Sequence, residues 1–149
     1  MADKTLIDSL LGRWRLVGAW AGVPNGTDLV PAYGDAPPDG MIHYDADGRM
    51  MAMITSGNRA LIDGDRQSAP PEQRAAAFAD CLGYAGRWEI EGDRITHHVE
   101  LATVPNWIGT DLVRFISWQG DQLRLRTAPQ MHKGSLAVID LLWQKMDAA

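Results

Sequence analysis

The stretch YAGRWEIEGDRITHHVEL, residues 84–101, decides the fold. Apolar and polar residues alternate on both sides of Gly92-Asp93, as they do in two half-buried strands joined by a tight turn. The alternation predicts an antiparallel hairpin, and a two-residue turn fixes its register so that Trp88 faces His97. This hairpin therefore indicates a β protein in which one face of the sheet is buried and the other is exposed to solvent.

The same alternation recurs along most of the chain. Asp-Ala-Asp-Gly at 45–48 and Gly120-Asp121 are further hairpin turns, and the second places Arg114 opposite Thr127. We expect eight strands, over residues 13–20, 40–44, 49–55, 84–91, 94–101, 110–118, 122–127 and 136–145. Eight antiparallel strands joined by hairpins predict an all-β, closed up-and-down barrel, because closure removes exposed edges. A packed β-sandwich is the alternative. An eight-stranded barrel has room for one small ligand.

Three segments do not fit the strand pattern. Residues 23–40 are rich in Pro and Gly and predict a long ordered loop. Residues 70–82, PPEQRAAAFADCL, begin with proline and continue with strong helix formers, which predicts the one substantial helix and places Cys81 in it. A short turn of helix is expected before Gly12. With no repeat or linker, residues 1–149 are expected to form a single domain.

Composition excludes several classes of protein. The net charge is -5, and no Lys/Arg cluster is present, so neither nucleic acid nor an anionic membrane is expected as a partner. No apolar run reaches the roughly 20 residues of a membrane span. A single cysteine excludes an internal disulfide or a Cys-cluster zinc site, and we expect a reduced, cytoplasmic protein. No nucleotide-binding fingerprint or Ser/His/Asp triad occurs, so no cofactor is expected.

Longer motifs resemble a known family. LLGRWRLV contains the Gly12-x-Trp14 pattern that opens the first strand of lipocalin-type barrels. PAYGDAPPDGMIHYDADGRMMAMI, with Arg59 following, and YAGRWEIEGDRITHHVELATVPNWIGTDLVRF extend the match over nearly the whole chain. The chain resembles the bacterial and fungal lipocalin-like domain family. This resemblance implies a calycin-type barrel with one open end, a small-molecule binder or biosynthetic accessory protein, and a basic residue, here Lys145, covering Trp14.

The alternation also separates interior from exterior side chains. His98 and Glu100 are expected to face solvent. If Leu101 faces Thr110 across the longer loop, His97 faces Arg114. The side chains expected to point inward are Tyr84, Trp88, Ile90, Ile95, His97, Val99, Leu101, Leu112, Arg114, Ile116, Trp118, Leu123 and Leu125.

Two polar residues, His97 and Arg114, therefore lie on an apolar face. A buried arginine needs an anionic partner, because an unpaired buried charge is very costly. Asp140, Glu100 or an anionic group of a ligand can fill that role, and the sequence leaves all three open. Histidine has a pKa suited to proton transfer near neutral pH. A metal site is not expected, because the adjacent histidines face opposite sides of their strand.

The six tryptophans and seven methionines are the strongest compositional indication of a flexible, aromatic cavity. Trp14, Trp118 and Trp143 are interpreted as core packing. Tyr84 is expected to orient the polar end of a ligand, and Arg59 is expected at the rim. The residues expected to line the cavity are Trp20, Trp88, Trp107, Met51, Met53 and Met131.

These features predict binding of a small, mostly apolar or aromatic molecule that carries a polar or anionic group. The alternative is a cofactor-independent isomerase, cyclase, hydratase or lyase, with His97 as general acid or base and Arg114 as oxyanion stabiliser. A third hypothesis is an interaction module with a filled interior. The expected partner is a small molecule, and a homodimer is possible.

Overall fold

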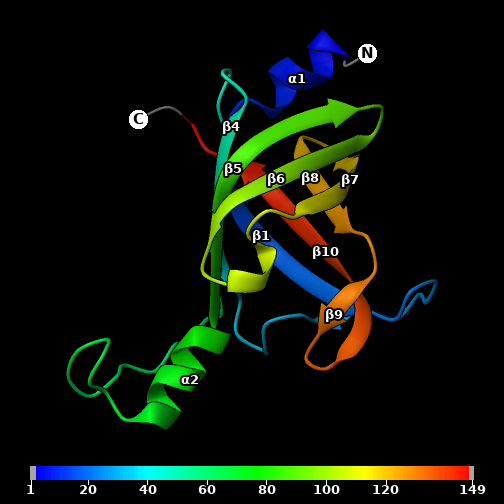
Figure 1. Ribbon diagram of the computed structural model, residues 1–149. Coiled ribbons are helices and arrows are strands. Elements are labelled where there is room, and N and C mark those ends of the chain that lie inside the picture. The colour runs from blue at the N-terminus through cyan, green and yellow to red at the C-terminus, as the bar shows by residue number, and fades with distance from the viewer. Residues whose placement is uncertain (1–2, 148–149) are drawn as a thin grey trace.

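The computed structural model describes residues 3–147 and shows a closed β-barrel with a short helix at one end and a longer helix beyond the other (Figure 1). The elements are α1 (Lys4–Leu10), β1 (Gly12–Gly22), β2 (Val30–Pro31), β3 (Asp39–Tyr44), β4 (Arg49–Thr55), α2 (Pro71–Ala79), β5 (Cys81–Glu91), β6 (Arg94–Ala102), the 3₁₀ turn η1 (Pro105–Trp107), β7 (Asp111–Gln119), β8 (Gln122–Thr127), β9 (Gln130–His132) and β10 (Ser135–Lys145).

Eight antiparallel strands make the barrel wall. They follow the order β1-β3-β4-β5-β6-β7-β8-β10, and β10 pairs with β1 to close the circle. The two short strands β2 and β9 add to β1 and β10 near their ends. The predicted eight-stranded up-and-down barrel is therefore confirmed, with these two additions.

The tight hairpins have the predicted registers. Trp88 pairs with His97 across β5 and β6, and Arg114 pairs with Thr127 across β7 and β8. Two-residue turns leave one pairing that keeps the apolar set on the inner face, which is why the sequence predicts them correctly.

The register of β6 against β7 differs from the conditional prediction. His97 pairs with Leu112, and Arg114 pairs with Ile95 instead of His97. The connection contains η1 and returns early, because Gly109 donates to the Val99 carbonyl at 2.9 Å. Leu101 therefore extends beyond the ladder, and His97 and Arg114 are not directly opposite.

Two β-bulges reverse the alternation of inward and outward side chains at positions that the sequence does not mark. The β5–β6 register shifts at Gly86, which leaves Glu100 as an extra residue, and Leu101 is 69% exposed instead of inward. A Cβ on Gly86 would lie 1.9 Å from the His98 carbonyl oxygen, so only glycine fits beside the bulge. In β1 the shift falls at Val17, and Ala19 and Ala21, not Trp20, join the core.

The end of the barrel beside α1 is closed. Leu10 of α1 is fully buried and its carbonyl accepts a hydrogen bond from Trp14 Nε1 at 2.9 Å. Lys145 Nζ lies 4.9 Å from the centre of the Trp14 ring and donates to the Leu11 carbonyl. The predicted cover of Trp14 by Lys145 is confirmed, and the cation–π contact holds β10 on β1.

The long helix is shorter than predicted. α2 ends at Ala79, and Cys81 is the first residue of β5, so the expected helical position of Cys81 is wrong. Gly83 and the β-pairing of Cys81 with Thr55 explain the difference, because the ladder with β4 satisfies the backbone that a longer helix would use. Figure 1 shows α2 beyond the end of the barrel opposite α1.

Among residues 3–147, no helix combines the length and the apolar character needed to cross a bilayer.

Candidate functional site

The barrel encloses a small cavity of about 30 Å³ between its core and the end opposite α1. Apolar side chains such as Ile42 and Leu125 form much of its wall. The polar groups that reach it come from different strands and loops. They belong to Tyr33, Tyr84, His97, Arg114, Thr127, Gln130 and Trp143.

His97 is held at both ring nitrogens. The Tyr44 hydroxyl lies 2.7 Å from Nε2, and the Tyr84 hydroxyl lies 2.8 Å from Nδ1. Burial, together with the nearby Arg114 charge, holds the pKa of His97 well below its ordinary value. His97 is therefore neutral, so one ring nitrogen donates to one tyrosine and the other accepts from the second. A ligand has no free His97 nitrogen to contact directly.

Arg114 is only 7% exposed and points inward, as the alternation predicts. Its Nη1 donates to the Val113 carbonyl at 3.0 Å. Within the part of the chain that the structure describes, no carboxylate lies within salt-bridge distance of its guanidinium.

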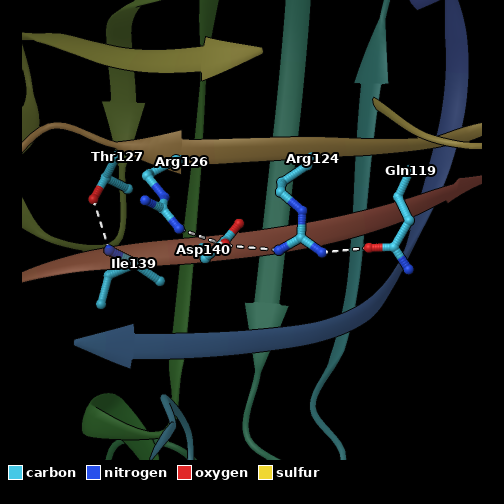
Figure 2. Close-up of polar contacts among 6 residues, drawn as sticks. All are labelled: Gln119, Arg124, Arg126, Thr127, Ile139 and Asp140. Carbon is cyan, nitrogen blue, oxygen red and sulfur yellow. Dashed lines mark hydrogen bonds and ion pairs between the residues drawn. The ribbon is translucent and has the colours of Figure 1, made fainter. Parts of the chain in front are cut away.

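Both protein partners expected for Arg114 are engaged elsewhere. Asp140 faces the outside of β10, where its Oδ2 accepts hydrogen bonds from Arg124 Nη1 at 2.7 Å and Arg126 Nη2 at 3.1 Å. Figure 2 shows these two arginines converging on Asp140 from the neighbouring strand β8. Glu100 pairs with Arg49 on the outer face of the barrel. Of the three candidate partners, the structure excludes Asp140 and Glu100, because both belong to the opposite face.

Two tyrosines beside Arg114 stay protonated at neutral pH. Burial raises the pKa of Tyr33 to about 12, although the Arg114 charge acts in the opposite direction. Burial likewise raises the pKa of Tyr84, again against the effect of Arg114. A neutral phenol can donate one hydrogen bond, so the Tyr33 hydroxyl adds a donor near the guanidinium, and the Tyr84 hydroxyl does so when His97 Nδ1–H donates to it.

Trp143 contributes a donor that the sequence interpretation missed. It is 1% exposed, lines the cavity, and its indole Nε1 has no hydrogen-bond partner. A buried indole N–H almost always finds an acceptor, so an unpaired one in a cavity wall is an unusual feature. Tyr44 was also missed. Carrying the alternation along 40–44 would have found it, because Ile42 and Tyr44 share the inner face.

The other predicted tryptophans lie in three different places. Trp88 is buried beside Tyr44, with ring centres 5.0 Å apart, and therefore packs against the tyrosine that is hydrogen-bonded to His97. Trp107 on η1 lines the cavity and packs edge-on against Tyr84 at 5.9 Å. Trp20 follows the β1 bulge onto the outer face, where its ring lies over Gly18, so its predicted place in the cavity is wrong.

The predicted methionines and Arg59 are outside the barrel. Met51 and Met53 are 67% and 56% exposed, because the inner face of β4 carries Met50, Ala52 and Ile54. Met131 on β9 is 66% exposed. Arg59 donates to the Ala77 carbonyl of α2 at 3.0 Å and is exposed. The structure brings none of these four side chains to the cavity.

His98 faces outward, as predicted. Its Nδ1 lies 2.6 Å from Asp111 and its Nε2 lies 2.7 Å from Glu89. These hydrogen bonds, chiefly the one with Asp111, raise the pKa of His98. Nowhere in residues 3–147 are three or more His, Cys, Asp or Glu side chains grouped so that they could hold a metal ion.

The cavity is therefore rich in donors and lacks carboxylates. Arginine, tyrosine and indole groups surround it, and the described residues that line it include no Asp or Glu. Such a site is complementary to a molecule that presents acceptor oxygens, above all an anionic one.

Comparison with known proteins gives the class to which this barrel belongs. Residues 11–146 match the family model of the lipocalin-like domain, and the chain belongs to that family. It is 33% identical over 88 residues to the protein of Aspergillus oryzae (strain ATCC 42149 / RIB 40) named 4'-hydroxy-3'-methoxypropiophenone carrier protein ppsC. That alignment covers 53% of this chain and 79% of the Aspergillus protein.

Two solved structures are similar in shape at low identity. One is a lipocalin-like protein from Bacteroides uniformis ATCC 8492, with 12% identity, a TM-score of 0.45, and coverage of 93% of this chain and 99% of that one. The other is an uncharacterized protein from Bacteroides eggerthii DSM 20697, with 11% identity, a TM-score of 0.41, and coverage of 92% and 99%.

Proposed function

We propose that this protein binds a small, mostly apolar or aromatic molecule inside the barrel and holds an anionic or acceptor oxygen of that molecule against Arg114. Tyr84, Tyr33 and Trp143 add neutral donors to the same oxygen-binding site. The apolar wall supplies affinity for the rest of the molecule, and the donors fix its orientation.

One observation carries this proposal: a nearly buried guanidinium has no carboxylate partner among the described residues. An unpaired buried cation destabilises a fold, so the presence of Arg114 favours pairing with an anionic group of a bound ligand. The unpaired Trp143 N–H in the same cavity supports this interpretation independently. Neither feature is needed for packing alone, because an apolar side chain would fill either position.

The cavity has to enlarge for this function. A volume of about 30 Å³ accommodates roughly two water-sized groups, whereas sites for small organic ligands are typically about 300–1,000 Å³. Trp107 and Tyr33 are only partly buried, and both reach the cavity from outside the barrel wall, on η1 and on the loop before β3. We propose that these two segments move outward when a ligand enters.

The relative from Aspergillus oryzae is consistent with this ligand class. Its name gives an aromatic ketone with a phenolic hydroxyl as the carried molecule. We propose a ligand of similar chemistry for the present chain, with its acidic hydroxyl or ketone oxygen at Arg114. Met53, Met131, Trp20 and Arg59 have no part in this proposed interior site.

A titration of tryptophan fluorescence tests the proposal. The probes are 4'-hydroxy-3'-methoxypropiophenone, aromatic carboxylates and phenols, each paired with a neutral methyl ether or ester. We expect each acidic probe to bind about tenfold or more tightly than its neutral partner, and Arg114→Met to abolish that preference. Arg15→Met, an exposed arginine on the outer face, is the matched control and should bind like the native protein. Flat titrations across the set, or an unchanged preference in Arg114→Met, would overturn the proposal.

A catalytic function is a second proposal, supported by the hydrogen-bonded chain from Tyr44 through His97 to Tyr84. Because both nitrogens of His97 are engaged, a proton would pass between ligand and histidine through the Tyr84 hydroxyl, with Arg114 stabilising negative charge on the ligand oxygen. Turnover that is lost in Tyr84→Phe while binding persists would support it. Turnover that survives both Tyr84→Phe and His97→Gln would rule this route out.

The cytoplasmic location, and the absence of nucleic acid and membrane partners, remain predictions from the sequence.

A further inference from the structure

A large apolar groove lies on the outer face of the barrel, across β3, β4, β5 and β6. Its volume is about 560 Å³, far larger than that of the interior cavity. Arg13, His43 and Tyr84 are the charged or titratable side chains among the described residues that line it. Five of its apolar side chains are at least half exposed, namely Met41, Met51, Met53, Leu101 and Ile108.

A protruding segment joins two of the strands that carry this groove. Residues 56–80, here called the arm, join β4 to β5 and contain α2. Figure 1 shows α2 standing clear of the barrel, and no residue of α2 is buried. The base of the arm is closed by the Ser56 N–H, which donates to the Asp80 carbonyl at 2.8 Å.

The arm is ordered by its own contacts. Gln73 bonds both the backbone and the side chain of Asp63, Arg74 Nε donates to the Ala69 carbonyl, and Arg59 donates to the Ala77 carbonyl. Despite this order the arm leaves apolar side chains in water, with Leu61 95% exposed and Phe78 53% exposed. A structured element with exposed apolar side chains and little barrel contact is typical of one that packs on a partner.

The size of the apolar patch, compared with the area that a stable dimer buries, indicates what covers the groove. Each of the five side chains is at least half exposed, and the largest apolar patch on a typical monomer covers roughly 300–600 Å². A stable dimer buries about 800 Å² on each partner, so the patch alone is too small for one. The arm, which carries Leu61 and Phe78, supplies the missing area if it is part of the same interface.

We propose that two copies of this chain form a dimer in which the arm of each copy lies in the groove of the other. A two-fold axis makes both contacts at once, because each chain carries one groove and one arm, and both leave apolar side chains exposed. Met41, Met51 and Met53 suit this role, since flexible thioether side chains adapt to an inserted apolar side chain. The proposal does not rest on the ligand proposed for the barrel, although Ile42, Ala52 and Tyr84 line both the groove and the interior cavity.

Sedimentation velocity across a wide range of protein concentration tests the dimer. We expect the mass of two 16.4 kDa chains. Met51→Glu, Leu101→Glu and Leu61→Asp should each weaken the dimer about tenfold or more. Val17→Glu places the same charge on a 45% exposed outer position of β1 outside the groove, and it should leave the dimer intact. All four positions are exposed, and thermal melts verify that each variant is folded.

A cross-link identifies which surfaces meet. In a Cys81→Ser background, Leu61→Cys and Met51→Cys are made in separate chains and mixed under oxidising conditions. A disulfide between the two different chains is expected. A monomer at all concentrations would overturn the proposal. So would a dimer that the groove variants weaken while Leu61→Asp and the mixed cross-link have no effect, because the grooves would then face each other. Groove variants that reduce small-molecule binding and leave the dimer unchanged would assign the groove to a ligand instead.

Discussion

Replacing Arg114 with methionine should stabilise the ligand-free protein. Arg114 is 7% exposed, contacts the Val113 carbonyl and has no carboxylate partner within residues 3–147. Methionine has a similar length and no charge, so the substitution removes the desolvation penalty and adds apolar burial. Against this stands the loss of one hydrogen bond from a charged donor, about 1.5–3 kcal/mol.

The net effect is expected to be a gain of about 1–3 kcal/mol in the free energy of unfolding, since removing poorly compensated buried charge stabilises folds by amounts of this order. For a chain of this size that corresponds to a rise in Tm of about 3–10 °C. Urea denaturation monitored by tryptophan fluorescence, with a thermal melt in parallel, measures both quantities.

Arg124→Met is the matched control and should have the opposite sign. Arg124 donates to Asp140 at 2.7 Å, and Asp140 is 2% exposed. Removing this partner leaves a buried carboxylate with only Arg126, and a loss of about 2–4 kcal/mol is expected. A loss of 1 kcal/mol or more in Arg114→Met would refute the reasoning, because Arg114 would then be a structural residue rather than one that awaits a counter-charge.

Three further variants test other parts of the structure. Tyr44→Phe removes a hydrogen bond from buried His97 and should lower the unfolding free energy by about 1–3 kcal/mol, with a changed His97 ring-nitrogen spectrum in NMR; no change in that spectrum would contradict this hydrogen bond. Gly86→Ala places a Cβ 1.9 Å from the His98 carbonyl and should cost about 3 kcal/mol or more in urea denaturation, and a variant within 0.5 kcal/mol of native would exclude the bulge as drawn. The pKa of His98 is raised in the folded state, so its hydrogen bonds with Asp111 and Glu89 stabilise the protein fully below the ordinary His pKa of 6.5, and this contribution is lost as pH rises through the folded value. His98→Gln should therefore destabilise the protein more at pH 5.5 than at pH 9 in urea titrations, and an equal loss at both pH values would contradict this linkage.

The hairpins were predictable because a two-residue turn leaves no freedom of register. Gly92-Asp93 and Gly120-Asp121 therefore place His97 and Arg114 on the inner face from the sequence alone. The loop that contains η1 carries no such constraint, and the predicted pairing of His97 with Arg114 was wrong by two residues.

The bulges account for most of the misplaced side chains. An extra residue at Val17 turns Trp20 outward, and an extra residue at Glu100 does the same to Leu101. Nothing in the local sequence distinguishes these positions from regular strand, because the requirement for Gly86 comes from the neighbouring strand. Met53 had a simpler signal that was overlooked, since Met50, Ala52 and Ile54 form the more regular inner set of β4.

The polar partners inside the barrel also depend on three-dimensional closure. Tyr44 and Tyr84 come from strands that are far apart in the chain, and both meet His97. The interpretation of Trp143 as core is correct for its ring, but it does not account for the unpaired N–H. Sequence alternation shows that a side chain points inward, but it does not show whether a polar atom finds a partner there.

The central claim is that a ligand oxygen enters the cavity between Arg114 and Trp143. The most direct test is a ¹⁵N NMR titration with 4'-hydroxy-3'-methoxypropiophenone that follows the indole N–H signals of the six tryptophans and the Arg114 Nε–H signal. Trp143→Phe assigns the key indole signal. We expect the Trp143 and Arg114 signals to move downfield together as they gain an acceptor, while those of Trp14 and Trp20 stay in place. A ligand that binds but leaves the Trp143 and Arg114 signals unchanged would contradict the account.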